Sequence, residues 1–238
     1  MILIGDLHGG YPEILSRIRK FKMASTALIQ VGDWGLGFQP VDDDLRVLRQ
    51  TDDFLGSQHN MLYIIRGNHD NKWFWDNRDD FHLQNIRLVK DYEYLTIEDS
   101  KILFAGGGIS IDRINRTQGK DYWPDEEIVW DAAALKGACE AGIDIMVSHI
   151  APREAWPYTY DPLVQHFASR ELAAGRNLTA ALEDERKVMS EIFRDIKEAG
   201  CHTWYYGHYH ASQVEEKEGI TFRCLGIGEM YDAGNVKI

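Results

Sequence analysis

The stretch ILIGDLHGG, residues 2–10, joins an apolar run of strand length to two side chains with metal-binding chemistry. The run 2–4 suits a short buried strand, and Gly5 permits a sharp turn before Asp6 and His8. Carboxylate oxygens and imidazole nitrogens are common metal ligands. A single stretch of this kind is more often an ordinary turn after a strand, so its meaning depends on whether the pattern recurs.

The same pattern recurs four more times along the chain. LIQVG precedes Asp33, LYIIRG precedes Asn68-His69-Asp70, IMVS precedes His149, and WYYG precedes His208, with His210 two residues further on. In layered α/β folds, ligand sites lie just outside the carboxyl ends of the strands. We therefore predict that five strand ends of one sheet converge on one metal site.

The side chains at these strand ends supply seven oxygen and imidazole ligands: Asp6, His8, Asp33, Asn68, His149, His208 and His210. One tetrahedral ion needs about four ligands, so this number is too large unless one residue bridges two ions. Asp33 has two carboxylate oxygens and is the candidate bridge. Two ions about 3.5–4 Å apart form the clamp used in hydrolytic phosphoryl transfer. Two carboxylates would leave two divalent ions with about two units of positive charge, which a phosphate can neutralise.

Four of these motifs also follow a glycine, at Gly5, Gly32, Gly67 and Gly207. Glycine has no Cβ atom, so it allows sharp turns and close approach of the backbone to other groups. A crowded site with two ions needs both properties.

Short apolar runs alternate with helix-period segments, which indicates an α/β layered fold. The expected helices are a segment with Ile14, Leu15, Ile18 and Phe21 on one face, and segments at about 43–56, 125–141 and 179–199. Two β-hairpins are predicted, one turning at EDS, residues 98–100, and the other at Glu218-Gly219. We expect a single domain, residues 1–238, with two mixed sheets packed together and helices outside.

Charge and cysteine content limit the partners and the compartment. The 238-residue chain has a formal net charge of −12, and no basic cluster is longer than RIRKFK at 17–22. Stable binding along duplex nucleic acid is therefore not expected, although a small or single-stranded substrate stays possible. No run approaches the roughly 18 apolar residues of a membrane span, and the first ten residues show no secretory signal. Three widely spaced cysteines fit a reducing cytoplasm.

The motifs GDLHG, GDWG, GNHD, SH (148–149) and GHYH, in this order, resemble those of the calcineurin-like metallophosphoesterases. The resemblance extends from residue 5 to residue 210. It implies a four-layer α/β/β/α sandwich with two metal ions at the carboxyl ends of the strands. One ion would be held by Asp6, His8, Asp33 and His210, and the other by Asp33, Asn68, His149 and His208.

The resemblance also implies the chemistry. His69 matches the catalytic histidine of the family, which protonates the leaving oxygen or stabilises the transition state. The expected reaction is hydrolysis of a phosphate ester by in-line attack of a hydroxide held between the two ions. Mn²⁺ is the first expectation for both ions, with Fe or Zn as alternatives, because mixed oxygen and nitrogen ligands without thiolate do not select zinc strongly.

One motif departs from the protein-phosphatase and diadenosine-polyphosphate branch of the family. That branch continues its second motif as GDxxDRG, whereas this chain reads GDWGLGF, with Leu36 in place of the second acid and no arginine after it. The acid that orients the catalytic histidine and the arginine that grips phosphate are both missing there. Asp70 is a candidate for the first role. Arg113, carried over the metals by the glycine run 106–108 with Tyr122 or Trp123 beside it, is the candidate for the second role.

Arg116 and Arg66 are weaker candidates for gripping phosphate. The substrate is expected to be a phosphorylated small molecule, a nucleotide or a phosphopeptide. The choice between a phosphomonoesterase, including a protein phosphatase, and a nucleotide-type phosphodiesterase or nuclease stays open. Aromatic residues near the motifs could stack on a nucleobase, but core packing is the commoner role for such residues. A non-catalytic scaffold on the same fold is the alternative outside enzymes, although the full ligand set and His69 argue against it.

Overall fold

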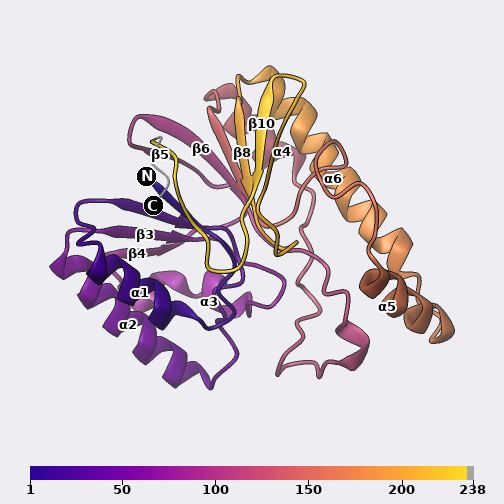
Figure 1. Cartoon of the computed structure of the whole chain (residues 1–238), viewed down its shortest axis with the longest axis horizontal. Helices are drawn as coiled ribbons and strands as arrows, with labels where there is room; N and C mark the ends of the chain where they lie inside the picture. The colour runs from indigo at the N-terminus through magenta and orange to yellow at the C-terminus, as the bar shows by residue number, and fades with distance from the viewer. Residues whose placement is uncertain (235–238) are drawn as a thin grey trace.

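Two β-sheets packed face to face form the centre of the molecule in a computed structural model, which describes residues 1–234 (Figure 1). The last four residues of the domain expected over 1–238 lie outside the described part. Within residues 1–234, the first sheet has five strands in the order β11-β1-β2-β3-β4. Their bounds are Met230–Asp232, Ile2–Ile4, Ala27–Gln30, Met61–Ile64 and Ile86–Leu88. Strands β1 to β4 are parallel, and β11 is antiparallel to β1.

The second sheet, over the same described residues, has six strands in the order β5-β6-β7-β8-β10-β9. Their bounds are Tyr94–Ile97, Ser100–Ala105, Ile145–Ser148, Thr203–Tyr206, Ile220–Cys224 and Gln213–Lys217. The four inner strands are parallel, and β5 and β9 are antiparallel to their neighbours. Both hairpins predicted from the sequence are present, β5 with β6 and β9 with β10, and both sheets are mixed as expected.

Helices cover the outer face of each sheet. α1 (Tyr11–Lys20) and α2 (Val41–Ser57) pack on the first sheet, and α4 (Ala132–Glu140) and α6 (Leu178–Glu198) pack on the second. The alternation of side chains along a strand makes this layering possible. Leu28 of β2 faces the helices, whereas its neighbour Ile29 faces the other sheet and packs with Phe104. The four-layer α/β/β/α arrangement is therefore confirmed.

Two expectations about the helices are wrong at their ends. Phe21 does not lie on the buried face of α1, because the helix ends at Lys20 and Phe21 is 49% exposed. The helix expected from residue 125 begins only at Ala132, where the carboxylate of Asp131 accepts hydrogen bonds from the first backbone N–H groups. Residues 125–127 instead present their carbonyl oxygens to the buried guanidinium of Arg66.

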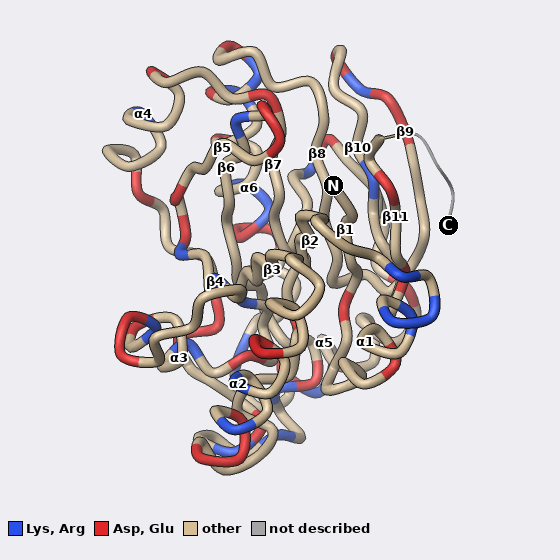
Figure 2. Tube along the Cα trace, turned by 90° about the vertical axis from the view of Figure 1, so that its left-hand side faces the viewer, with Lys and Arg blue, Asp and Glu red and all other residues tan. Residues whose placement is uncertain are grey.

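Several elements were not predicted at all. The strands β4 and β11 have three residues each, and the remaining helices are α3 (Trp73–Asp76), α5 (Pro162–Ala173) and the 3₁₀ turns η1 (Arg78–Phe81) and η2 (Arg113–Asn115). Charged residues concentrate on helices and loops, whereas β1, β2 and β3 in the centre carry none (Figure 2). Among the helices of residues 1–234, each is too short or too polar to cross a bilayer.

Candidate metal centre

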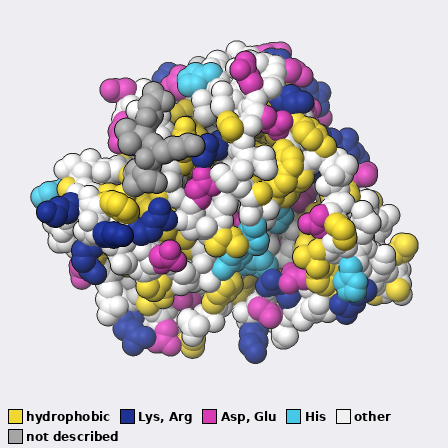
Figure 3. Space-filling model, in the orientation of Figure 1, with side chains coloured by type: hydrophobic (Ala, Val, Ile, Leu, Met, Phe, Trp, Pro, Cys, Tyr) yellow, Lys and Arg dark blue, Asp and Glu magenta, His cyan; other side chains and the backbone are white. Residues whose placement is uncertain are grey.

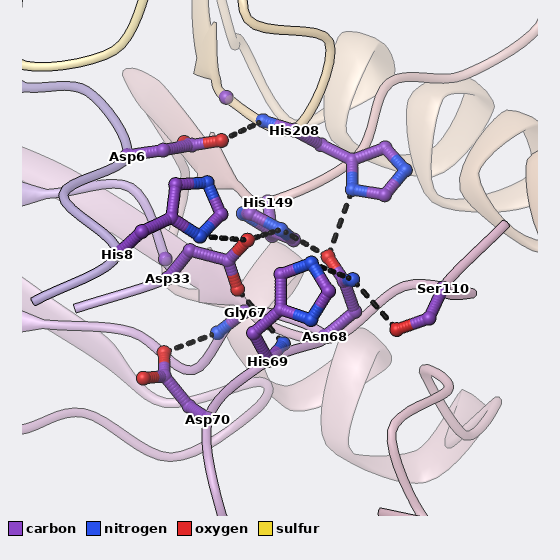
Figure 4. A network of polar contacts seen from close by, with 12 residues as sticks. Asp6, His8, Asp33, Gly67, Asn68, His69, Asp70, Ser110, His149 and His208 are labelled. Carbon is purple, nitrogen blue, oxygen red and sulfur yellow. Dashed lines mark hydrogen bonds and ion pairs between the residues drawn. The ribbon is translucent and has the colours of Figure 1, made fainter. Parts of the chain in front are cut away.

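The seven expected ligands lie together where strand ends of both sheets meet. Figure 4 labels six of them, all except His210. Asp6, Asp33 and Asn68 follow β1, β2 and β3 of the first sheet. His149 and the pair at 208 and 210 follow β7 and β8 of the second sheet. The expectation that one sheet supplies all five strand ends is therefore wrong. The five ends still converge, because the parallel strands of the two packed sheets direct their carboxyl ends to one shared edge.

One group of ligands consists of Asp6, His8 and His210. Nε2 of His210 lies 3.0 Å from Nε2 of His8 and 3.4 Å from Oδ2 of Asp6. One ligand atom from each residue lies within 4.8 Å of the others. Two imidazole nitrogens at such a distance need either a shared proton or a cation between their lone pairs.

A second group consists of Asn68, His149 and His208. Oδ1 of Asn68 lies 2.8 Å from Nε2 of His149 and 2.9 Å from Nδ1 of His208. Nδ1 of His149 donates to the carbonyl of Val31 at 2.8 Å, so its Nε2 atom is the one turned to the centre. Burial alone would lower the pKa of His149, but the carboxylate of Asp33 raises it to about 9. The carboxylate of Asp33 therefore favours positive charge at this position, as a bound cation would supply.

Asp33 lies between the two groups. Its Oδ2 atom is 3.7 Å from Nδ1 of His8 and 3.6 Å from Nε2 of His149, one histidine from each group. Its Oδ1 atom accepts a hydrogen bond from the backbone N–H of His69 at 2.9 Å. Burial would raise the pKa of Asp33, but His149 and the neighbouring histidines hold it below its usual range. Asp33 is thus a carboxylate placed to contact both groups.

Glycine is required where the backbone passes against these carboxylates. A Cβ atom on Gly67 would collide with Oδ1 of Asp33, and one on Gly207 would collide with Oδ1 of Asp6. Both collisions involve a candidate ligand atom, so a larger residue would displace the ligand. The close approach expected from the sequence is therefore present.

The residues present fit a pair of divalent cations. Oδ1 of Asp6 is buried and has no hydrogen-bond partner among residues 1–234, which is costly for a carboxylate oxygen unless a cation neutralises it. The donor set contains oxygen and imidazole nitrogen only, which suits borderline divalent metals.

His69 lies beside both groups with a defined ring orientation. Its Nε2 atom is 3.2 Å from the amide nitrogen of Asn68 and 3.4 Å from Nη2 of Arg116, and both of these are donors. Nε2 is therefore the acceptor, and the ring proton of the neutral form sits on Nδ1. This Nδ1 atom is buried and has no hydrogen-bond partner in the described residues. Burial, together with Arg116 and His8, lowers the pKa of His69 to about 4 against the opposing effect of Asp33.

Asp70 does not orient His69. Its carboxylate accepts hydrogen bonds from the backbone N–H groups of Trp34, Gly35, Leu36 and Gly67, at 2.8–3.2 Å. It ties the loop after β2 to the loop after β3. The acid that GDWGLGF lacks is thus supplied by Asp70 of GNHD, three residues after Gly67. This carboxylate binds backbone N–H groups rather than an imidazole ring.

The arginines occupy different places from those expected. Arg113 turns away from the centre and pairs with Glu171 at 3.4 Å and Glu127 at 3.7 Å. Arg116 faces the centre: its Nε atom donates to Asp112 at 2.6 Å while Nη2 points to His69. Arg66 is buried between Asp91 and the carbonyls of residues 125–127 and is structural. The preference for Arg113 over Arg116 is therefore wrong.

Two residues that the sequence did not suggest fix the amide of Asn68. Its Nδ2 atom donates to Oγ of Ser110 at 2.9 Å, and this hydroxyl donates to Oε2 of Glu126 at 2.6 Å. Glu126 also accepts from the backbone N–H of Ser110. The chain of bonds directs Oδ1 of Asn68 toward the histidines. Nothing in the local sequence marks Ser110 or Glu126, because they lie in an irregular loop far from the motif they support.

The aromatic residues near the motifs mostly belong to the core. Trp34, Phe74 and Trp75 are buried under the first sheet. Trp123 donates from Nε1 to the carbonyl of His69 at 3.1 Å and so holds the backbone of that residue. Tyr122 does not line the cavity described next, within the described residues.

A cavity of about 490 Å³ opens over the centre. One side is polar and contains Asp33, Asn68, His69, His208 and His210, together with Arg116. The other side is formed by Ile111 and Asp112 just before η2, by the segment 156–161, and by α5 and α6. Figure 3 shows the histidines in a hollow near the middle of this face, with hydrophobic side chains beside them. A volume of this size is typical of small-molecule sites.

Comparison with known proteins agrees with this geometry. A family model described as calcineurin-like phosphoesterase matches residues 1–212. The search of curated proteins found no significant match. The solved structure of a phosphopantetheinyl hydrolase from Mycobacterium tuberculosis is 14% identical with a TM-score of 0.54, and the match covers 95% of this chain and 89% of that one. An archaeal phosphodiesterase is 13% identical, with a match that covers 95% of this chain and 84% of that one and a TM-score of only 0.40. The first similarity shows the fold alone.

Proposed function

Because the chain belongs to the calcineurin-like phosphoesterase family, we propose that its two ligand groups bind two divalent ions and that it hydrolyses a phosphate mono- or diester in the cavity above them. Members of this family use paired divalent metals, and the chain is a phosphoesterase. The single observation that carries the proposal is the position of Asp33. Its carboxylate faces one histidine of each group, as a bridge between two ions requires.

The proposed ligand sets follow from the two groups. Asp6, His8 and His210 would hold one ion, Asn68, His149 and His208 the other, and Asp33 both. When bound, such ions lower the pKa of water and neutralise charge on phosphoryl oxygens. We propose Mn²⁺ as the native metal, because the set has no thiolate.

The remaining steps belong to side chains of the chain itself. Nη2 of Arg116 points into the cavity from a guanidinium held by Asp112, so it is placed to bind a phosphoryl oxygen. His69 lines the cavity, and its neutral ring carries a proton on Nδ1, which has no acceptor among residues 1–234, so we place this ring beside the leaving oxygen. In-line attack by water then replaces the ester oxygen on phosphorus. His69 stabilises the charge that develops on that oxygen.

Two further aspects are proposed on the sequence. We place the protein in the cytoplasm, since two of its three cysteines, Cys201 and Cys224, are buried thiols rather than members of a disulfide framework. We also treat the chain as one functional domain, because both sheets contribute ligands to the same centre.

A hydrolysis panel with Mn²⁺ tests the proposal. The panel compares p-nitrophenyl phosphate, bis-p-nitrophenyl phosphate and a nucleotide for the wild type and for His69→Ala. The variant should keep its metal and lose turnover by roughly 10²–10⁴-fold, the usual contribution of general acid–base catalysis. The loss should be smaller for p-nitrophenolate esters than for alkyl esters, because a good leaving group needs less assistance. His59→Ala, at an exposed position, is the control and should match the wild type. Absence of hydrolysis on every substrate would refute the proposal.

A further inference from the structure

One half of the cavity has no role in the chemistry described so far. It is walled by apolar side chains of α5, of α6, of the loop just before η2 and of the segment between β7 and α5, among them Ile111, Trp156, Val164, Phe167 and Leu182. Leu163, at the start of α5, also lines it and is 56% exposed. From this geometry we propose that this half is a subsite for the organic group of the substrate, and that the substrate is a phosphate ester of an uncharged, largely apolar alcohol or phenol. The inference rests on the proposed function.

The apolar subsite is continuous with the metal centre, and this indicates which part of the substrate occupies it. His69, Arg116 and His208 line the same cavity as Val164 and Phe167. A phosphoryl group held near Arg116 therefore directs its ester group along the apolar wall. Ile111, Val164, Phe167 and Leu182 of this wall belong to a small hydrophobic cluster centred on Ile109, Leu178 and Leu182, which is separate from the three clusters that pack the sheets. Trp156 packs instead against the core cluster of the second sheet. The cluster is built mainly by α5 and α6.

The charged groups along this wall are already engaged, so they do not call for a charged ligand. Asp112 binds Arg116, and Asp161 accepts the backbone N–H of Val164 as the N-cap of α5. The guanidinium of Arg186 donates to the carbonyls of Pro152, Ala155 and Pro157. The carboxyl group of Glu185 accepts from the backbone N–H of Ile109 at 2.9 Å. What the wall offers a ligand is mainly apolar surface.

Binding of alkylphosphonates to the Mn²⁺-loaded protein tests this without turnover, because the phosphorus–carbon bond is not hydrolysed. Methyl-, butyl- and octylphosphonate share one head group and differ only in the apolar chain. Each buried methylene should tighten Kd by about fourfold, so the octyl compound should bind at least about 100-fold tighter than the methyl compound. The heat-capacity change of binding, measured by calorimetry, should become more negative with chain length.

Two leucines on the same helix give a matched pair of variants. Leu163→Ser should raise the Kd for octylphosphonate by about 3- to 10-fold and leave the Kd for methylphosphonate unchanged. Leu172→Ser is the control, because Leu172 is 66% exposed and lies on α5 away from the cavity. It should change neither affinity. Val164→Ser is a second test at the wall and should act like Leu163→Ser.

The possible outcomes separate the two proposals. Binding of methylphosphonate with no gain for longer chains would overturn the subsite and leave the proposed function standing. A nucleoside monophosphate that binds more tightly than octylphosphonate would also overturn it, in favour of a polar ester group. If no phosphonate binds and no ester in the panel is hydrolysed, the proposed function itself fails, and the subsite with it.

Discussion

At the scale of single residues, the proposed binding of phosphate depends on Arg116. Its guanidinium is anchored at one end by Asp112 and presents the other end to His69 and the cavity. Arg113, three residues earlier, is neutralised by Glu171 and Glu127. Two arginines of one short loop thus have opposite roles, one in the cavity and one in an ion pair under it.

Arg116→Ala should therefore lower kcat/KM by roughly 10–150-fold without changing the metal content, because a charge-assisted hydrogen bond contributes about 1.5–3 kcal/mol. Arg113→Ala is the matched comparison and should lower the free energy of unfolding rather than kcat/KM. Both are measured by steady-state kinetics, metal analysis and urea unfolding. A kinetic defect confined to Arg113→Ala would contradict this assignment.

The sequence indicated the positions of the candidate ligands better than those of the residues around them. The seven candidate ligands could be found because each follows an apolar run, and a strand end has a fixed place in the fold. The orientation of the Arg113 and Arg116 side chains could not be predicted from the sequence, because residue spacing within an irregular loop does not determine where a side chain points. Ser110 and Glu126 could not be found for the same reason: Ser110 contacts Asn68, and Glu126 contacts Ser110, only in the folded structure.

At the scale of elements, the turns after the strands are as important as the strands. Asp70 joins the turns after β2 and β3, and the backbone of Gly207, after β8, passes against Asp6 of the first sheet. The ligand positions therefore depend on small residues at these turns. The structure offers a control in α4, where a Cβ atom on Gly137 would meet open space.

Gly207→Ala should push Asp6 out of place, weaken metal binding and lower Tm. Gly137→Ala adds the same methyl group inside a helix and should stabilise the protein by roughly 0.5–1 kcal/mol, which raises Tm by about 1–4 °C in a chain of this size. Calorimetry and metal titration of both variants are the measurements. Equal behaviour of the two variants would show that the turn tolerates a side chain.

The elements that the sequence missed or misplaced have separate physical causes. α4 starts late because Arg66 binds the carbonyls of residues 125–127, and such a long-range contact leaves no periodic signal. α5 packs on a small cluster beside the cavity and leaves Leu163 and Leu172 exposed, so its pattern of apolar residues is weak. β11 has three residues and is defined by its pairing with β1, 226 or more residues away in sequence.

At the scale of the whole molecule, the cavity carries a buried acid that makes stability depend on pH. Burial, with a contribution from Glu127, raises the pKa of Glu185 from 4.5 to about 8. The folded state therefore holds a proton that the unfolded state releases above pH 4.5. The contribution of Glu185 to stability is fully present below that pH and decreases as the pH rises toward 8.

Glu185→Gln should remove this dependence. The amide keeps an acceptor for the N–H of Ile109 and carries no charge, so the variant should exceed the wild type in free energy of unfolding at pH 8 by a few kcal/mol, since one pKa unit corresponds to about 1.4 kcal/mol. At pH 5 the two should be nearly equal. Glu183→Gln, at an exposed position on the same helix, should follow the wild type at both values. If the free energies of unfolding of Glu185→Gln and the wild type change in parallel with pH, the assignment of a buried, neutral carboxyl group to Glu185 is contradicted.

Both sheets contribute ligand groups to one centre, so the central claim is that two divalent ions bind there and are needed for hydrolysis. Titration of the chelator-treated protein with Mn²⁺, with bound metal and hydrolysis of p-nitrophenyl phosphate followed together, tests this most directly. Activity should be absent without metal and should reach its plateau as the second ion per chain binds. Asp33→Asn should bind less metal and stay inactive. Asp53→Asn, at an exposed position, is the control and should match the wild type. Full activity after verified removal of metal, or full metal content and activity in Asp33→Asn, would contradict the account.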